Sequence, residues 1–222
     1  MSLSQKIKSF LQKYKHIWVF SYGLIYLPWF FWLEHHVTTD YHMIHCSLDD
    51  KIPFIEFFII PYLLWFFFIA AVALYFFFTD TAGFYRLCIV LAVGMTAFLL
   101  ISTVYPNGLA LRPTVFSRDN IFTDMVRTLY AADTPTNVLP SIHVYNTLAS
   151  CFAISHSEAL KKHRIITGGA YVLSALIILA TMFLKQHSVI DVCVATAMAY
   201  LVRIFVYMPA GKKVVRVSRQ TV

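Results

Sequence analysis

The chain is short of charged residues. Only 13% of its 222 residues carry a formal charge, about half the share usual in soluble domains. Hydrophobic residues make up 59% of the sequence, and the mean hydropathy is +0.68. Aromatic residues, with 20 Phe and 13 Tyr, suit lipid-facing surfaces and interfacial belts. This composition excludes an ordinary soluble domain and indicates a polytopic membrane protein.

Cysteine is scarce, and acidic residues are fewer than basic ones. The four cysteines lack the spacing of a zinc site or a disulfide framework, so we expect neither, and no other metal or cofactor. The net charge of +7 comes from Lys and Arg in separate short segments, which argues against nucleic acid as a partner. Histidines and acids between residues 34 and 50 match no metal-ligand pattern, so we interpret that stretch as a polar interfacial loop.

Six apolar segments have about the 20 residues needed to cross a bilayer. We predict an all-α integral membrane protein, formed by one membrane-embedded domain over residues 1–222 with basic tails at about 1–15 and 209–222. The fourth segment contains several polar residues, so we expect it to be buried among the others. The long connection at roughly 105–139 has a length often associated with function. The predicted spans are roughly 16–33, 53–78, 83–104, 140–156, 165–184 and 188–208.

Most Lys and Arg fall on one side of these six spans. They occupy both tails and the loops after the second and fourth spans. The positive-inside rule therefore predicts cytoplasmic termini, with anionic lipids as partners of the basic loops. The opposite ends of the spans would face outside, most simply at the plasma membrane. The sequence leaves the oligomeric state open.

Ionisable residues occur at the predicted outer ends of two spans. His187 and Asp191 are four residues apart and therefore share one face of a helix, and His143 starts another apolar run. Ionisable groups in such segments usually have a function. An imidazole oriented by a carboxylate can attack phosphorus, and a second imidazole can protonate the leaving group. We therefore predict His187, Asp191 and His143 as catalytic residues.

Three further residues on the same predicted side suit phosphate binding. Arg112 lies in the long outer loop, Lys185 at the end of the fifth span and Ser141 at the start of the fourth. Cations neutralise the phosphate oxygens during phosphoryl transfer, and a hydroxyl adds a hydrogen-bond donor. The helix N-termini after Ser141 and His187 would add backbone N–H groups. We predict Arg112, Lys185 and Ser141 as phosphate ligands.

These motifs resemble those of the type 2 phosphatidic acid phosphatase superfamily. Arg112-Pro113, the run from Pro140 to His143, and His187 with Asp191 match that family's three motifs in order. The resemblance implies a membrane-embedded hydrolase that acts on a lipid phosphate monoester, such as phosphatidic acid, through a phosphohistidine. No cofactor is implied.

Three positions depart from that family's pattern. Tyr105 stands where the family usually has Lys, Ile142 where it has Gly, and Thr181 where it has Arg. Lys185 could supply the missing cation. The remaining set is similar to that of the sphingomyelin synthase and inositol phosphorylceramide synthase branch, which transfers a phospho-headgroup to a lipid alcohol. A headgroup transferase is therefore the alternative to a lipid phosphatase. A non-catalytic membrane transporter is the second alternative, for which ionisable residues at the bilayer midplane would be expected.

Overall fold

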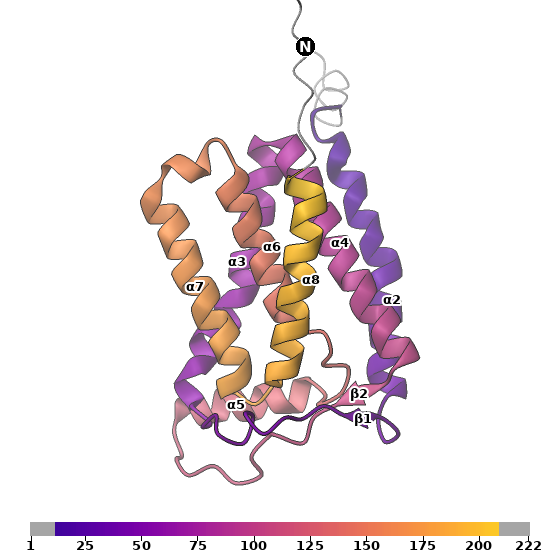
Figure 1. The fold of residues 1–222 in the computed structure, drawn as a ribbon, viewed down its shortest axis with the longest axis vertical. Helices are drawn as coiled ribbons and strands as arrows, with labels where there is room; N and C mark the ends of the chain where they lie inside the picture. The colour runs from indigo at the N-terminus through magenta and orange to yellow at the C-terminus, as the bar shows by residue number, and fades with distance from the viewer. Residues whose placement is uncertain (1–11, 209–222) are drawn as a thin grey trace, which may run out of the picture.

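The computed structural model describes residues 12–208 and shows a bundle of long helices with a layer of loops and one short helix across one end (Figure 1). The predicted basic tails lie almost entirely outside these residues. A two-residue parallel pair joins β1 (His42–Met43) to β2 (Asn107–Gly108). In chain order the helices are η1 (Lys15–Tyr22), α2 (Gly23–His36), η2 (Glu56–Phe58), α3 (Ile59–Thr79), α4 (Thr81–Val104), α5 (Ile121–Ala132), α6 (Ile142–His156), η3 (Leu160–Lys162), α7 (Arg164–Phe183) and α8 (Val189–Tyr207).

Within the described residues, five helical segments are long and apolar enough to cross a membrane. They are Lys15–His36, Glu56–Thr79, Thr81–Val104, Arg164–Phe183 and Val189–Tyr207. Many of their large apolar side chains are exposed, which suits contact with lipid rather than water. The all-helical membrane fold is thus supported, whereas the count of six spans and the cytoplasmic position of the termini stay predictions.

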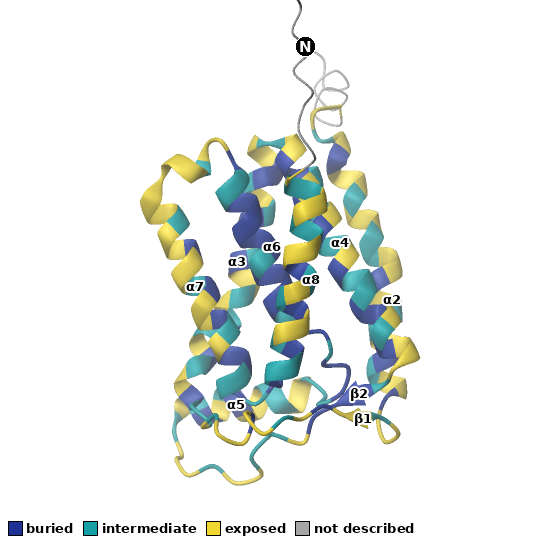
Figure 2. Cartoon of the chain, in the orientation of Figure 1, coloured by how far each residue is buried: buried dark blue, intermediate teal, exposed yellow. Residues whose placement is uncertain are grey.

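The fourth predicted span, residues 140–156, forms a helix that is too short to cross a bilayer. Helix α6 has 15 residues, which rise about 22 Å along the helix axis, less than the roughly 30 Å of a hydrocarbon core. It packs against α3, α4, α7 and α8, and most of it is buried (Figure 2). A helix enclosed by other helices can be shorter and more polar than one that faces lipid. The expectation that this segment is buried among the others is confirmed.

Close packing brings α6 against α4. A Cβ atom at Gly94 would collide with the ring of Tyr145, and the Tyr145 hydroxyl donates a hydrogen bond of 2.9 Å to the Val90 carbonyl. Gly94 therefore lets a buried tyrosine lie against the α4 backbone. This contact fixes the depth at which α6 sits in the bundle.

The loop layer at one end of the bundle covers the N-terminal ends of α6 and α8 (Figure 1). The connection at 105–139, predicted only as a long loop, contains the amphipathic helix α5, which lies across this end. Asn120 caps α5 by accepting hydrogen bonds from the backbone N–H groups of Phe122 and Thr123. The basic residues Arg86, Lys161, Lys162 and Arg164 lie at the opposite end, near the α3–α4 and α6–α7 connections.

Candidate active site

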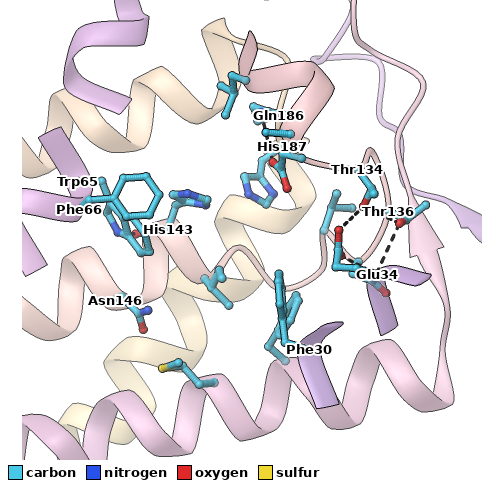
Figure 3. A pocket seen from close by; sticks show the side chains of 18 of the residues that line it. Phe30, Glu34, Trp65, Phe66, Thr134, Thr136, His143, Asn146, Gln186 and His187 are labelled. Carbon is cyan, nitrogen blue, oxygen red and sulfur yellow. Dashed lines mark hydrogen bonds between the residues drawn. The ribbon is translucent and has the colours of Figure 1, made fainter. Parts of the chain in front are cut away.

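The three predicted catalytic residues lie together at the loop end of the bundle. The ring centroids of His143 and His187 are 5.8 Å apart, and Figure 3 shows the two imidazoles facing each other. His187 Nδ1 lies 3.4 Å from a carboxylate oxygen of Asp191. His187 and Asp191 are both buried. The i, i+4 spacing in the sequence thus corresponds to a real contact, and His143 reaches it from a different helix.

The turn between α7 and α8 places His187. At the end of α7 the N–H groups of Lys185 and Gln186 donate to the carbonyls of Met182 and Thr181, at 3.0 and 2.9 Å. Lys185 has a φ of 54°, so it takes the left-handed position that usually follows a helix in a Schellman motif. The chain then reverses at once into α8, with His187 in the turn.

Asp191 is held by the first turn of α8. Ser188 caps this helix, and the Ser188 N–H donates a hydrogen bond of 2.8 Å to the same Asp191 oxygen that faces His187. The other carboxylate oxygen of Asp191 is buried without a hydrogen-bond partner among the described residues. A carboxylate fixed in this way can orient the His187 ring and stabilise positive charge on it.

Aromatic rings hold His143 from the side of α3. Its imidazole lies 4.3 Å from Trp65 and 4.8 Å from Tyr62, centroid to centroid, and Trp65 Nε1 donates to the His143 carbonyl at 3.1 Å. His143 Nδ1 has no hydrogen-bond partner within the described chain. The ring is therefore fixed in place by packing and lines the cavity, with its Nδ1 atom enclosed by the protein.

Arg112 lies beside the site, but its guanidinium group is engaged by the protein. It donates to the carbonyls of Asp133 and Thr134 at 2.7 and 3.0 Å and to Gln186 Oε1 at 2.5 Å. It also stacks over Tyr130 and lies 3.8 Å from an Asp133 carboxylate oxygen. Burial lowers the pKa of Arg112, and the Asp133 charge opposes that shift. The predicted phosphate ligand instead connects the end of α5 to Gln186, the residue before His187.

Lys185 and Ser141 also have structural partners. Lys185 Nζ donates to the carbonyls of Asp49 and Ile52 at 2.7 and 2.5 Å, so it anchors the first loop, and its role as the missing cation stays a prediction. Thr181 itself is fully buried. Ser141 is fully buried too, and its Oγ caps α6 by accepting from the Val144 N–H at 3.3 Å. The contacts of both predicted ligands are those of helix capping and loop anchoring.

The N-terminus of α8 is occupied by a carboxylate of the protein. Asp49 accepts hydrogen bonds from Ser188 Oγ at 2.7 Å and from the Val189 N–H at 2.8 Å. Burial opposes the ionisation of Asp49, yet these hydrogen bonds and that from Cys46 lower its pKa overall. These two donors at the start of α8 are therefore used by Asp49, and phosphate binding at this helix end stays a prediction. The contact of Asp49 with α8 could not be predicted from sequence spacing, because Ser188 and Val189 lie about 140 residues further along the chain.

A cavity of about 430 Å³ opens at the histidine pair. Helices α2, α3 and α4 supply apolar and aromatic walls, including Phe30, Trp65 and Phe98. Polar groups gather at the end with the histidines (Figure 3). None of the described residues that line the cavity is Lys or Arg. The polar lining residues that sequence analysis did not select are Glu34, Asp133, Thr134, Thr136, Asn137, Asn146 and Gln186.

The histidine-rich first loop shows local pairing rather than a gathered site. His45 Nε2 lies 2.9 Å from an Asp50 carboxylate oxygen, and both side chains are exposed. Within residues 12–208, no group of three or more His, Cys, Asp or Glu is arranged to hold a metal ion.

Comparison of the chain with protein-family models, with curated proteins and with solved structures finds no match.

Proposed function

We propose that this chain is an integral-membrane lipid phosphatase that hydrolyses a lipid phosphate monoester through a phosphohistidine. The observation that supports it is the arrangement of two facing imidazoles, one backed by a buried carboxylate, at the polar end of an apolar cavity. The apolar walls suit the chains of an amphiphile, and the histidine pair at the polar end is placed to act on its phosphate ester. Phosphatidic acid is the first substrate to test.

His187, His143 and Asp191 each have a defined part in this mechanism. The Nε2 atom of His187 attacks phosphorus, so a P–N bond forms while the bond from phosphorus to the lipid oxygen breaks. His143 gives a proton to the departing alkoxide. Asp191 accepts a hydrogen bond from the Nδ1–H of His187 and stabilises the charge on the phosphorylated ring. Water then attacks phosphorus, His143 takes up its proton, and inorganic phosphate leaves with His187 regenerated.

The proposed active site faces outside, most simply at the plasma membrane. The described loops at the opposite end of the bundle carry Lys161, Lys162 and Arg164, and cytoplasmic loops are enriched in such residues. Anionic lipids of the inner leaflet would contact that basic end. Protease protection or cysteine labelling of either end in intact cells tests this orientation.

Transfer of a phospho-headgroup to a lipid alcohol is the second candidate, and a specific observation favours it. The described cavity lining has no Lys or Arg but several hydrogen-bond acceptors, including Glu34 and Asp133. A dianionic phosphate monoester gains little from such a wall, whereas a hydroxyl acceptor could donate to it. Radiolabelled phospholipid with and without an added lipid alcohol separates the two candidates, because transfer yields labelled lipid and hydrolysis yields free phosphate.

The decisive assay uses purified protein in lipid nanodiscs. We expect release of phosphate from phosphatidic acid, and a loss of roughly 10²–10⁴-fold in kcat for His143→Ala, with at least that for His187→Ala. His163→Ala is the matched control, because His163 is exposed at the opposite end of the bundle. Wild-type turnover in both site variants would refute the proposal. Substrate flux without any turnover would instead support the transporter alternative.

A further inference from the structure

Glu34 places a carboxylate on the cavity wall without a cationic partner in the described chain. Its oxygens accept hydrogen bonds from Thr134 Oγ1 at 2.5 Å and from Asn137 Nδ2 at 2.9 Å. Both donors are neutral, and no ion pair to Lys or Arg joins Glu34 within residues 12–208. Figure 3 shows this group across the cavity from His143, on the same side as Thr134 and Thr136.

Two carboxylates share one nearby cation. The guanidinium group of Arg112 pairs with Asp133 and lies within electrostatic reach of Glu34 as well. Burial raises the pKa of Asp133, Arg112 opposes that rise, and Glu34 adds to it, which shows that the two carboxylates are within electrostatic reach. The wall next to the histidines therefore carries more negative than positive charge. A phosphate group that enters alone meets this excess unfavourably, whereas a nearby positive group on the same molecule would offset it.

Aromatic rings complete the same wall. Phe30 lies one helical turn before Glu34 on α2, so both side chains share a face. Trp65 lines the cavity as well, and ring faces attract alkylammonium groups. The rings and the Glu34 carboxylate together favour a ligand that carries positive charge.

We propose that this wall recognises an ammonium group of the substrate, with Glu34 as the specificity-determining residue. This inference rests on the proposed function: the phosphate ester lies at the histidine pair, and the ammonium group lies a few bonds away at Glu34. The substrate class is a lipid that carries both groups. The ammonium group can belong to the lipid backbone beside a phosphate monoester, which is a substrate for the proposed phosphatase. It can also belong to an amino-alcohol headgroup esterified to the phosphate, which makes a diester that the headgroup-transfer candidate would use.

Two substrate pairs test the recognition and identify the source of the ammonium group. Phosphatidylethanolamine and phosphatidylethanol differ in the headgroup amine. Sphinganine 1-phosphate and its N-acetyl derivative differ in the charge of the backbone amine. We expect the ammonium member of one pair to show a kcat/KM at least about tenfold higher, as a desolvated cation at a carboxylate and ring faces should give. The pair that shows the preference identifies whether the ammonium group belongs to the headgroup or to the lipid backbone. Equal kcat/KM values within both pairs overturn the proposal.

Glu34→Gln tests the residue itself. We expect this variant to bring the ratio within the preferred pair close to one, while kcat/KM for the uncharged member changes about twofold or less. Asp40→Asn is the matched control, because Asp40 is exposed in the loop after α2. An equal loss for both members of the pair would mean that Glu34 only holds the Thr134–Asn137 segment, and would overturn its assignment. The wild-type ratios test the recognition even if the variant folds poorly.

Binding to His187→Ala separates this inference from the proposed function. This variant cannot form the phosphohistidine, so it reports recognition alone. Tighter binding of the ammonium lipid than of its uncharged partner, lost in His187→Ala combined with Glu34→Gln, supports the inference even if the wild-type protein turns over neither lipid. In that case only the proposed function fails. Turnover together with equal binding of both lipids overturns the inference and leaves the proposed function standing.

Discussion

Asp49→Asn should loosen the turn that carries His187 and Asp191. The Asp49 carboxylate is buried and accepts three hydrogen bonds, from Ser188 Oγ and from the backbone N–H groups of Cys46 and Val189. Asparagine keeps only one acceptor oxygen, so at least one of these buried donors faces an NH₂ group. An unsatisfied buried donor costs about 1–3 kcal/mol, and the lost charge at a helix N-terminus about 0.3–1 kcal/mol. We therefore expect a loss of roughly 1–4 kcal/mol in the free energy of unfolding.

Thermal or denaturant unfolding in a mild detergent measures this loss, with Asp50→Asn as the control. The Asp50 side chain is 65% exposed and pairs with His45, and surface substitutions of this kind usually change stability by about 0.5 kcal/mol or less. The fold lowers the pKa of Asp49. Its stabilisation is therefore fully present above the unfolded-state pKa and is lost as the pH falls through the lower folded value. Asp49→Asn should abolish this acid-side decline below about pH 4. Equal stability of the Asp49→Asn and Asp50→Asn proteins would refute the reasoning.

Two further substitutions test the site and the bundle. Arg112→Lys keeps the charge but loses the planar fork that reaches Gln186 and the carbonyls of Asp133 and Thr134 just after α5. We therefore expect a stability loss of about 1–3 kcal/mol together with a lower kcat. An unchanged melting temperature with an increased KM would indicate a direct phosphate ligand instead. Gly94→Ala should lower stability by about 1–3 kcal/mol because its Cβ enters the ring of Tyr145. Gly169→Ala is the control, because a Cβ atom at Gly169 would have no neighbour within 4 Å. We expect it to be neutral or stabilising by up to about 1 kcal/mol in the same melting experiment. Equal melting temperatures for the two alanine variants would contradict this packing.

Hydropathy and local spacing predicted much of this molecule. A long apolar run in a membrane forms a helix whatever elements pack against it. Residues four apart on a helix lie on the same face and are therefore close together. That is why the contact of His187 with Asp191 could be inferred without a structure. The shortness of α6 could not be inferred from the sequence. A helix that other helices enclose does not need to be long enough to cross the bilayer.

The roles of the polar residues around the histidines depended on long-range contacts. Lys185 and Arg112 have the right charge for a phosphate, but backbone carbonyls from distant segments take up their hydrogen bonds. Asp49 and Glu34 stood in a stretch without a recognisable pattern, and each contacts residues that lie 100 or more positions further along the chain. Sequence spacing carries no information about such pairs, so these functional candidates emerge only from the folded chain.

Trapping of the covalent intermediate tests the central claim most directly. Wild-type protein would be mixed with lipid labelled in its phosphate, quenched within a fraction of a turnover, and digested for mass spectrometry under alkaline conditions that preserve phosphohistidine. The mechanism predicts an acid-labile phosphoryl group on His187 in the wild-type protein and its absence in His187→Ala. Turnover of the lipid with no phosphoryl group on His187, or with the group on another residue, would contradict it.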